Sequence, residues 1–187
     1  SHRAYLTLAI PLILSTITTP LLGAVDTAVI GHLSHASYLG GVAVGTLIFN
    51  TLYWLFGFLR VSTSAFTAQA AGAQNNDQSI AALMRPLAIA LLIGGLFIIL
   101  QYPILLGSLQ IIHPAQDVAA QAAIYFNIRI WGAPLTLVNY VLLGWLMGLS
   151  RVKSTLFLQI SMNVINMLLA IGFTQIIDPV IKMVNFL

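Results

Sequence analysis

The stretch Pro20-Leu-Leu-Gly-Ala-Val-Asp26-Thr-Ala-Val-Ile-Gly-His-Leu33 places one carboxylate inside a long uncharged run. Asp26 is the only acidic residue among the first 76, and uncharged residues flank it from Tyr5 to Val25 and from Thr27 to Leu59. An Asp at the centre of a membrane helix costs about 2.5 to 3.5 kcal/mol, and such residues mostly face a cavity, a partner or an ion. Asp26 is therefore a candidate functional residue. The alternative is a position at the membrane edge, where it caps a helix or faces water.

The composition indicates that lipid surrounds most of the chain. Of its 187 residues, 59% are hydrophobic and only 6% are charged, whereas soluble domains carry about 25% charged residues. We therefore predict an all-α integral membrane protein whose surroundings are membrane lipids. The formal net charge of +3 is scattered over loops, which argues against a nucleic-acid partner. The first apolar stretch is too long for a signal peptide. Because the first residue is Ser, we expect that the natural start is missing.

Apolar runs long enough to cross the roughly 30 Å hydrocarbon core predict a bundle of five transmembrane helices plus a partial sixth. We predict one domain, 1–187, with helices over 5–30, 39–71, 80–106, 117–149 and 155–173, and the partial helix over 180–187. The first helix is too long to stand straight in the membrane. Pro11 and Pro20 predict where it bends, because a proline inside a helix removes a hydrogen bond.

The basic residues predict the orientation of the bundle. Cytoplasmic loops carry an excess of Lys and Arg. If the amino end is cytoplasmic, the basic residues Arg3, Arg85, Arg151 and Lys153 all lie inside. The two predicted outer loops, 32–38 and 107–116, then carry no Lys or Arg. Arg129 does not fit, since it falls in the outer half of the fourth helix. For a bacterial protein this predicts an inner-membrane location.

Several polar residues fall inside the predicted spans, and we take them as candidates for lining a hydrated cavity: Thr19, Asn139, Tyr140 and Asn163. Asn163 and Asn166 are three residues apart and share one helix face. Amides in lipid must find a partner, so helix–helix contact is an equally good explanation for them.

Motifs for other functions are missing from the sequence. His32 and His35 have metal-ligand spacing but no nearby Asp, Glu or Cys. The sequence contains no phosphate-binding loop, no HExxH and no GxSxG. We therefore expect no catalytic residues, no metal and no cofactor, and we predict that the chain is not an enzyme.

Four stretches, in the same order along the chain, resemble the MATE (multidrug and toxic compound extrusion) transporter family in its DinF-like branch. The first is Gly23-Ala-Val-Asp26-Thr-Ala-Val-Ile-Gly-His-Leu33, which resembles the first helix of the family. The others resemble the second, fourth and fifth helices and lie within 58–73, 125–148 and 163–169. The resemblance covers about residues 4 to 173.

The resemblance implies a secondary antiporter of twelve helices in two six-helix lobes around a central cleft. Such a protein exports small organic compounds, often cations, in exchange for H⁺ or Na⁺. By matching positions, Asp26 and Asn166 would take part in coupling to the cation, and Pro11 would bend the first helix. This chain would supply the amino-terminal lobe, and a second six-helix lobe in the same or another chain would complete the transporter.

Two departures from the family pattern leave alternatives open. Many DinF-like sequences carry an Asp where this chain has Ala170, so the coupling site would hold one carboxylate, which favours H⁺ over Na⁺. The sequence after Phe173 does not match well, so the chain could be a fragment, a truncated product or half of an assembly.

Within transport, a flippase for lipid-linked precursors is the alternative to efflux, although its cavity should be more basic. A non-transporting membrane remnant is the other alternative.

Overall fold

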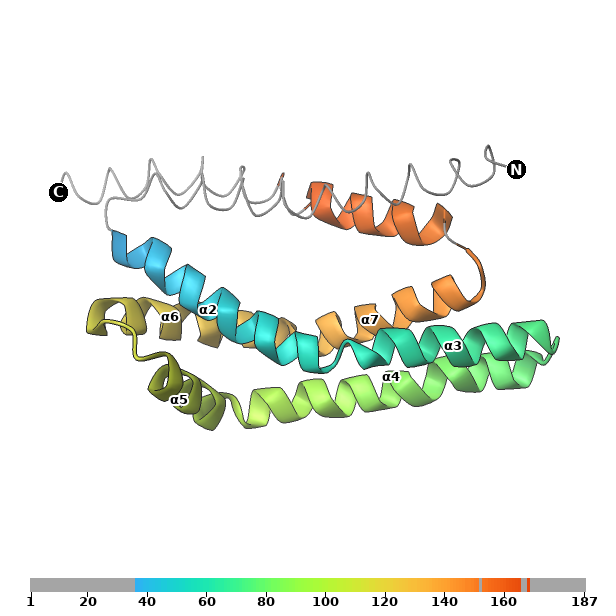
Figure 1. Cartoon of the computed structure of the whole chain (residues 1–187), viewed down its shortest axis with the longest axis horizontal. Coiled ribbons are helices and arrows are strands. Elements are labelled where there is room, and N and C mark those ends of the chain that lie inside the picture. The colour runs from blue at the N-terminus through green and yellow to red at the C-terminus, as the bar shows by residue number, and fades with distance from the viewer. Residues whose placement is uncertain (1–35, 152, 166–167, 169–187) are drawn as a thin grey trace. The chain divides into compact units, whose positions relative to one another are not determined.

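The computed structural model describes residues 36–151, 153–165 and 168. These residues belong to two units. The larger unit contains residues 36–151, and the smaller one contains residues 153–165 and 168. In the smaller unit, residues 153–165 are helical. The larger unit contains these helices in chain order (Figure 1): α2 Ala36–Leu55, α3 Phe58–Gly72, α4 Asn76–Ile99, α5 Gln101–Ile112, α6 Gln116–Arg129, the short 3₁₀ helix η1 Ile130–Gly132, and α7 Ala133–Gly148.

The described part of the chain is helical and contains no strand, which confirms the predicted all-α class. Within it, three helical stretches are long and apolar enough to cross a membrane: Ser37–Gly72, Asn76–Ile99 and Gln116–Gly148. The total of five helices and a partial sixth, in one domain, stays a prediction, because the predicted helices 5–30 and 180–187 lie outside the described residues.

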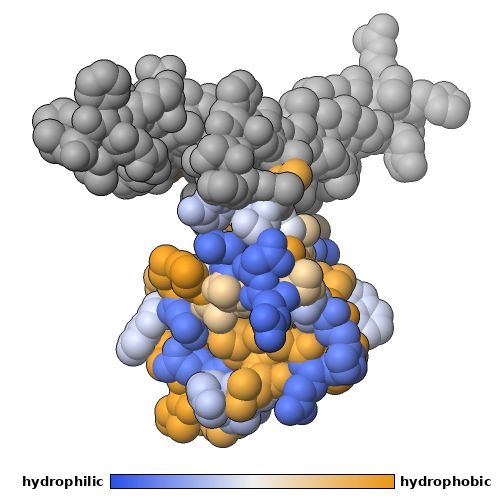
Figure 2. All heavy atoms as spheres, turned by 90° about the vertical axis from the view of Figure 1, so that its left-hand side faces the viewer, coloured by the Kyte–Doolittle hydropathy of each residue, from blue (hydrophilic) through white to orange (hydrophobic). Residues whose placement is uncertain are grey.

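Large apolar side chains cover the outer surface of the larger unit. Trp54 is 81% exposed, Ile111 82% and Ile99 76%. Figure 2 looks onto the end where α5 meets α6, and hydrophilic side chains there alternate with hydrophobic patches. Exposed apolar area on this scale is costly in water but is what a helix presents to lipid tails. The membrane prediction is confirmed.

The predicted helix 39–71 is divided into α2 and α3 by a turn at Phe56 and Gly57. Through this turn the backbone bonds tighten to three-residue spacing: the Phe56 amide donates to the Tyr53 carbonyl at 3.1 Å and the Gly57 amide to the Trp54 carbonyl at 3.1 Å. Glycine has a low helix propensity, and short 3₁₀ turns interrupt long helices at such positions. Together the two helices still form one long stretch.

The predicted helix 80–106 begins earlier and is divided near a proline. α4 begins at Asn76, where the Asn75 side chain caps it by accepting from the Gln78 amide at 3.0 Å. Pro103 has no amide hydrogen to donate to the Ile99 carbonyl, so the helix ends there and α5 follows. α5 continues to Ile112, which shortens the predicted loop 107–116 to 113–115. Pro86, by contrast, lies inside an unbroken α4.

The predicted helix 117–149 agrees closely in its bounds with the continuous stretch formed by α6, η1 and α7. α6 passes through the 3₁₀ turn η1 into α7, and the Ala133 amide donates to the Ile130 carbonyl. Pro134 lies in the first turn of α7, where a missing amide hydrogen costs little. The turn reorients the chain without ending the span.

Glycines set the closest contacts between these helices. α2 packs on α6, where a Cβ added to Gly45 would lie 2.3 Å from Tyr125 and one added to Gly41 would lie 2.9 Å from the Ala122 amide nitrogen. α3 and α4 both pack on α7, the latter through Gly94. Small residues let backbones approach in membranes, where association depends on packing rather than on exclusion of water. The buried core between the helices contains the stacked rings of Phe49 and Phe126, 5.1 Å apart.

Candidate functional site

The structure describes only part of the predicted site. Asp26, Asn166, Thr19, Pro11 and Pro20 lie outside the described residues, so their roles stay predictions.

Asn163 lies in the helix 153–165 and is half-buried, and it has an interaction partner. Asn139 and Tyr140 are half-buried neighbours on α7. Whether any of the three lines a cavity stays a prediction.

A cluster of polar and aromatic side chains joins α2 to α6 around Arg129. The Arg129 guanidinium carbon lies 5.3 Å from the centre of the Phe49 ring and 5.4 Å from that of Tyr125. The guanidinium also donates to the Tyr125 hydroxyl, and that hydroxyl lies 3.3 Å from Thr46 Oγ1. We call these residues, with Tyr53, the arginine cluster. Cation–π contacts and a tyrosine hydroxyl can hold a cation in an apolar region where water is scarce.

The arginine cluster extends to α7 through tyrosine hydroxyls. The Tyr53 side chain on α2 lies within reach of Thr136 on α7 and near Arg129 and Tyr140. The Thr136 hydroxyl in turn donates to the Gly132 carbonyl at 3.1 Å. Tyr140, a predicted cavity residue, is thus brought near the cluster, and no sequence pattern links the two.

Arg129 carries a charge that neither described carboxylate, Asp77 nor Asp117, neutralises through an ion pair. Both acids lie in the first turns of their helices, α4 and α6. The cluster therefore combines one positive charge with several hydroxyls, and its contacts hold the guanidinium between α2 and α6. The described residues contain no group of His, Cys, Asp or Glu able to hold a metal ion. His32 and His35 lie outside the described residues.

Sequence reasoning noticed Arg129 but not the residues around it. The four-residue spacing of Tyr125 and Arg129 puts them on one helix face, and this signal alone could have paired them. Tyrosine and tryptophan commonly anchor helices at the membrane interface, and Tyr125, Trp54, Tyr102 and Trp131 are residues of this kind. The last three are 81%, 69% and 63% exposed, whereas Tyr125 is half-buried against α2.

We expect Tyr125→Phe to lower the free energy of unfolding by about 1 kcal/mol, because it removes the hydrogen bond to a charged partner while keeping the ring. Thermal unfolding of the purified protein in detergent measures this loss. The matched control is Tyr102→Phe, which removes a hydroxyl from an exposed tyrosine on α5 and should change stability by less than about 0.5 kcal/mol. Equal effects of the two substitutions would contradict the cluster.

Two buried threonines form a separate polar feature. Thr63 and Thr67 on α3 are fully buried, and their hydroxyl oxygens have no hydrogen-bond partner among the described residues. Thr67 faces Gly148 on α7, since a Cβ added to that glycine would lie 2.6 Å from the Thr67 Cβ. These hydroxyls belong to the α3–α7 contact rather than to the arginine cluster.

Comparisons with known proteins agree with the geometry of a membrane helix bundle. The MatE family profile matches residues 11–171. DNA damage-inducible protein F of Escherichia coli (strain K12) is 45% identical over 169 residues, which is 90% of this chain and 37% of that protein. The probable multidrug resistance protein NorM of Shewanella oneidensis is 29% identical over 84% of this chain and 34% of its own length.

A third relative, multidrug resistance protein MdtK of Yersinia enterocolitica, is 31% identical over 81% of this chain and 33% of its own length. The chain therefore spans about a third of the length of the curated relatives it matches. No solved structure matches the chain. The profile match extends over most of the sequence, including Asp26 and the described helices, and the chain belongs to the MatE family of membrane transporters, with DinF-like character.

Proposed function

We propose that this chain forms part of a secondary antiporter that exports organic cations in exchange for H⁺ or Na⁺. MatE proteins are multi-pass membrane transporters rather than enzymes, and two of the relatives are named for multidrug resistance. The observation that carries the proposal is Asp26, a lone carboxylate in an apolar run inside the matched region. An ionisable residue inside a membrane segment usually marks the path of an ion or a substrate.

The coupling ion that best fits the sequence is H⁺. Sodium is a hard cation that prefers several oxygen ligands, and Ala170 leaves this part of the site without a second carboxylate. A proton needs one carboxylate only. Asn166 and the other candidate amides, Asn139 and Asn163, would then line the path with Tyr140 and Thr19. Bending at Pro11 or Pro20 would let the first helix change shape as the carboxylate is neutralised.

Transport in sealed vesicles tests this function. We expect the protein, reconstituted as it occurs naturally, to export a preloaded fluorescent organic cation when a pH gradient is imposed across the membrane. A sodium gradient of the same size should drive export at a much lower rate. Export driven by sodium alone would contradict proton coupling, and the absence of export under either gradient would contradict the antiporter function.

The arrangement of the loops supports a cytoplasmic amino end. Trp145 Nε1, near the end of α7, donates to the Ser79 carbonyl at 3.3 Å near the start of α4. The turn 73–75 and the basic turn after α7 therefore share one end of the bundle. Gly40 contacts Val118, so the start of α2 and the loop 113–115 share the other end, where loops lack Lys and Arg. By the positive-inside rule the first end faces the cytoplasm.

Cysteine labelling tests this orientation, because the chain has no cysteine of its own. We expect Ser34→Cys to react with an impermeant thiol reagent added to intact cells, and Asn76→Cys to react only after the cells are opened. Detergent-opened cells, in which both positions should react, are the control. Labelling at position 76 in intact cells, with none at 34, would reverse the orientation.

A second six-helix lobe, in the same or another chain, would complete the cleft. The relatives are about three times as long as the matched stretch, so they contain about twice its length in addition, which is enough for the rest of this lobe and a second one. The substrate, the inner-membrane location and the lobe are parts of one proposal, and each depends on the family match.

A further inference from the structure

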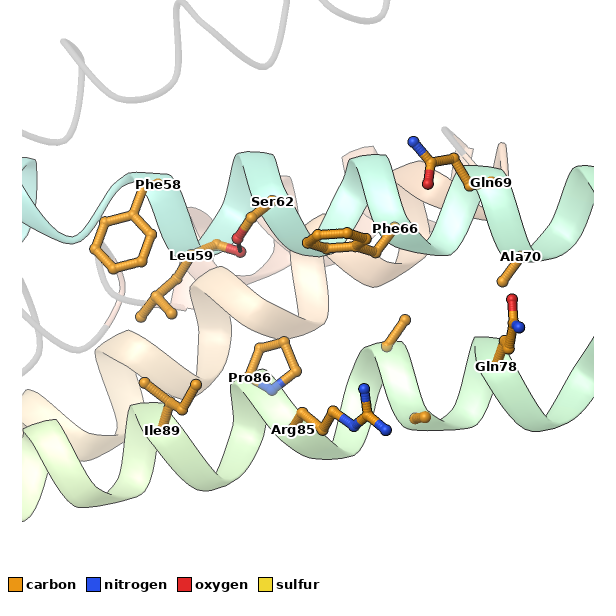
Figure 3. Close-up of a pocket in the computed structure, with 12 residues that line it drawn as sticks. Phe58, Leu59, Ser62, Phe66, Gln69, Ala70, Gln78, Arg85, Pro86 and Ile89 are labelled. Atoms are coloured by element: carbon orange, nitrogen blue, oxygen red, sulfur yellow. Dashed lines mark hydrogen bonds between the residues drawn. The ribbon is translucent and has the colours of Figure 1, made fainter.

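An open groove of about 460 Å³ lies between α3 and α4, outside the arginine cluster. Figure 3 shows the rings of Phe66 and Pro86 pointing into the space between the two helices. α7 contacts both helices, but every residue that lines the groove belongs to α3 or α4. Two of the lining side chains, Phe58 and Phe66, are more than half exposed, at 55% and 61%, so the groove opens outward.

The groove changes character along its length. α3 and α4 are antiparallel, so Gln69 and Gln78 line the end next to the turn 73–75, while Phe58 and Ile89 line the opposite end. Toward the turn its lining is polar or small, and away from the turn it is apolar apart from Ser62. An occupant that matches this lining has a polar head at one end and a hydrocarbon body at the other.

Arg85 supplies the only charge among the residues that line the groove. It directly precedes the uncharged run from Pro86 to Leu100. In Figure 3 its side chain extends along α4 toward Gln78 and the polar end. Long basic side chains reach in this way toward the headgroup level of a membrane. Neither described carboxylate, Asp77 nor Asp117, lines the groove or forms an ion pair with Arg85, so the charge at this position has no protein counterion among the described residues.

We propose that this groove binds an anionic phospholipid of the leaflet at the 73–75 end, with its phosphate at Arg85. The guanidinium donates to the phosphate oxygens, in the geometry that arginine shares with phosphate groups. The side-chain amide of Gln78 offers further donors to the headgroup. One acyl chain lies along Phe58, Leu59 and Ile89. Basic pockets between membrane helices recognise anionic headgroups by this combination of charge and apolar walls.

Photocrosslinking measures the proposed selectivity. The protein is reconstituted in phosphatidylcholine nanodiscs that contain a trace of phosphatidylglycerol with a photoreactive acyl chain, or of phosphatidylcholine with the same chain. Crosslinked peptides are then mapped by mass spectrometry. We expect phosphatidylglycerol to label residues 58–89 about five-fold more than phosphatidylcholine, which corresponds to one well-placed basic residue. This test does not depend on transport.

Variants assign the preference to Arg85. Arg85→Gln should remove the preference for phosphatidylglycerol, and Arg85→Lys should keep most of it. The matched control is Arg60→Gln, because Arg60 is exposed on α3 but does not line the groove; it should leave the preference unchanged. Ala82→Phe fills the groove and should reduce labelling by both lipids.

Four results would overturn the proposal. Equal labelling by the two lipids would indicate ordinary annular lipid, and an unchanged preference in Arg85→Gln would place the anion elsewhere. Loss of the preference on adding inorganic phosphate at millimolar concentration would indicate a site for a free anion. A groove that neither lipid labels, while other lipid-facing helices are labelled, would be covered by protein.

Discussion

Asp26→Asn is expected to abolish pH-driven export of an organic cation while leaving the protein folded and inserted in the membrane. The substitution keeps the size of the side chain and its hydrogen bonding but removes the group that can gain and lose a proton. It also removes the cost of a charge in an apolar run, about 2.5 to 3.5 kcal/mol, so the expression level should not fall. If Asp26 carries the coupling proton, the export rate under an imposed pH gradient should drop to that of empty vesicles.

Another acidic residue of the chain provides the control. Asp77 is exposed in the first turn of α4, where it interacts favourably with the positive end of the helix dipole. Asp77→Asn should therefore cost a fraction of a kcal/mol and leave export unchanged. Asp26→Glu, which keeps a carboxylate, should retain part of the activity. Normal pumping by Asp26→Asn would show that Asp26 is structural.

The class of the fold could be predicted from the sequence because a membrane restricts which segments can cross it. Spans must be apolar for about 20 residues and must satisfy their backbone bonds internally, and α4 and the run from Ser37 to Gly72 follow this rule. The breaks inside the spans were harder to predict. Pro103 divides a span, whereas Pro86 leaves α4 intact. Local sequence does not separate the two cases, because neighbouring helices decide whether the freed carbonyl and the bend are tolerated.

The arginine cluster could be predicted only in part. Tyr125 and Arg129 are one helical turn apart, which the sequence shows directly. Phe49 and Thr46 come from a helix about 80 residues earlier in the chain, as the separation of 79 residues between Thr46 and Tyr125 shows. Helices that are apolar on all sides carry no stripe that marks the packed face. The pairing of α2 with α6, and hence the cluster, follows from the three-dimensional contacts alone.

Glycines are the part of the sequence that does mark packed faces. Gly144-Trp-Leu-Met-Gly148 places two glycines on one face of α7, a spacing that lets membrane helices approach closely. A Cβ added to Gly144 would lie 2.4 Å from the Arg60 carbonyl oxygen, and one added to Gly148 would lie 2.6 Å from the Ser64 carbonyl oxygen. Both obstacles are backbone atoms of α3, which cannot rotate away as a side chain would. Any larger residue must push the two helices apart.

Gly144→Leu is therefore expected to destabilise the protein by about 3 kcal/mol or more, the upper range for overpacking a close contact, although leucine has the higher helix propensity. Gly95→Leu is the matched control, because no atom lies within 4 Å of a Cβ added to that α4 glycine. It should be neutral or slightly stabilising by the same propensity argument. Thermal unfolding in detergent, with size-exclusion chromatography to measure the folded fraction, compares the two. If Gly144→Leu unfolds at the same temperature as Gly95→Leu, α3 does not contact α7 through Gly144. The buried face of Thr63 and Thr67 would then have to pack elsewhere.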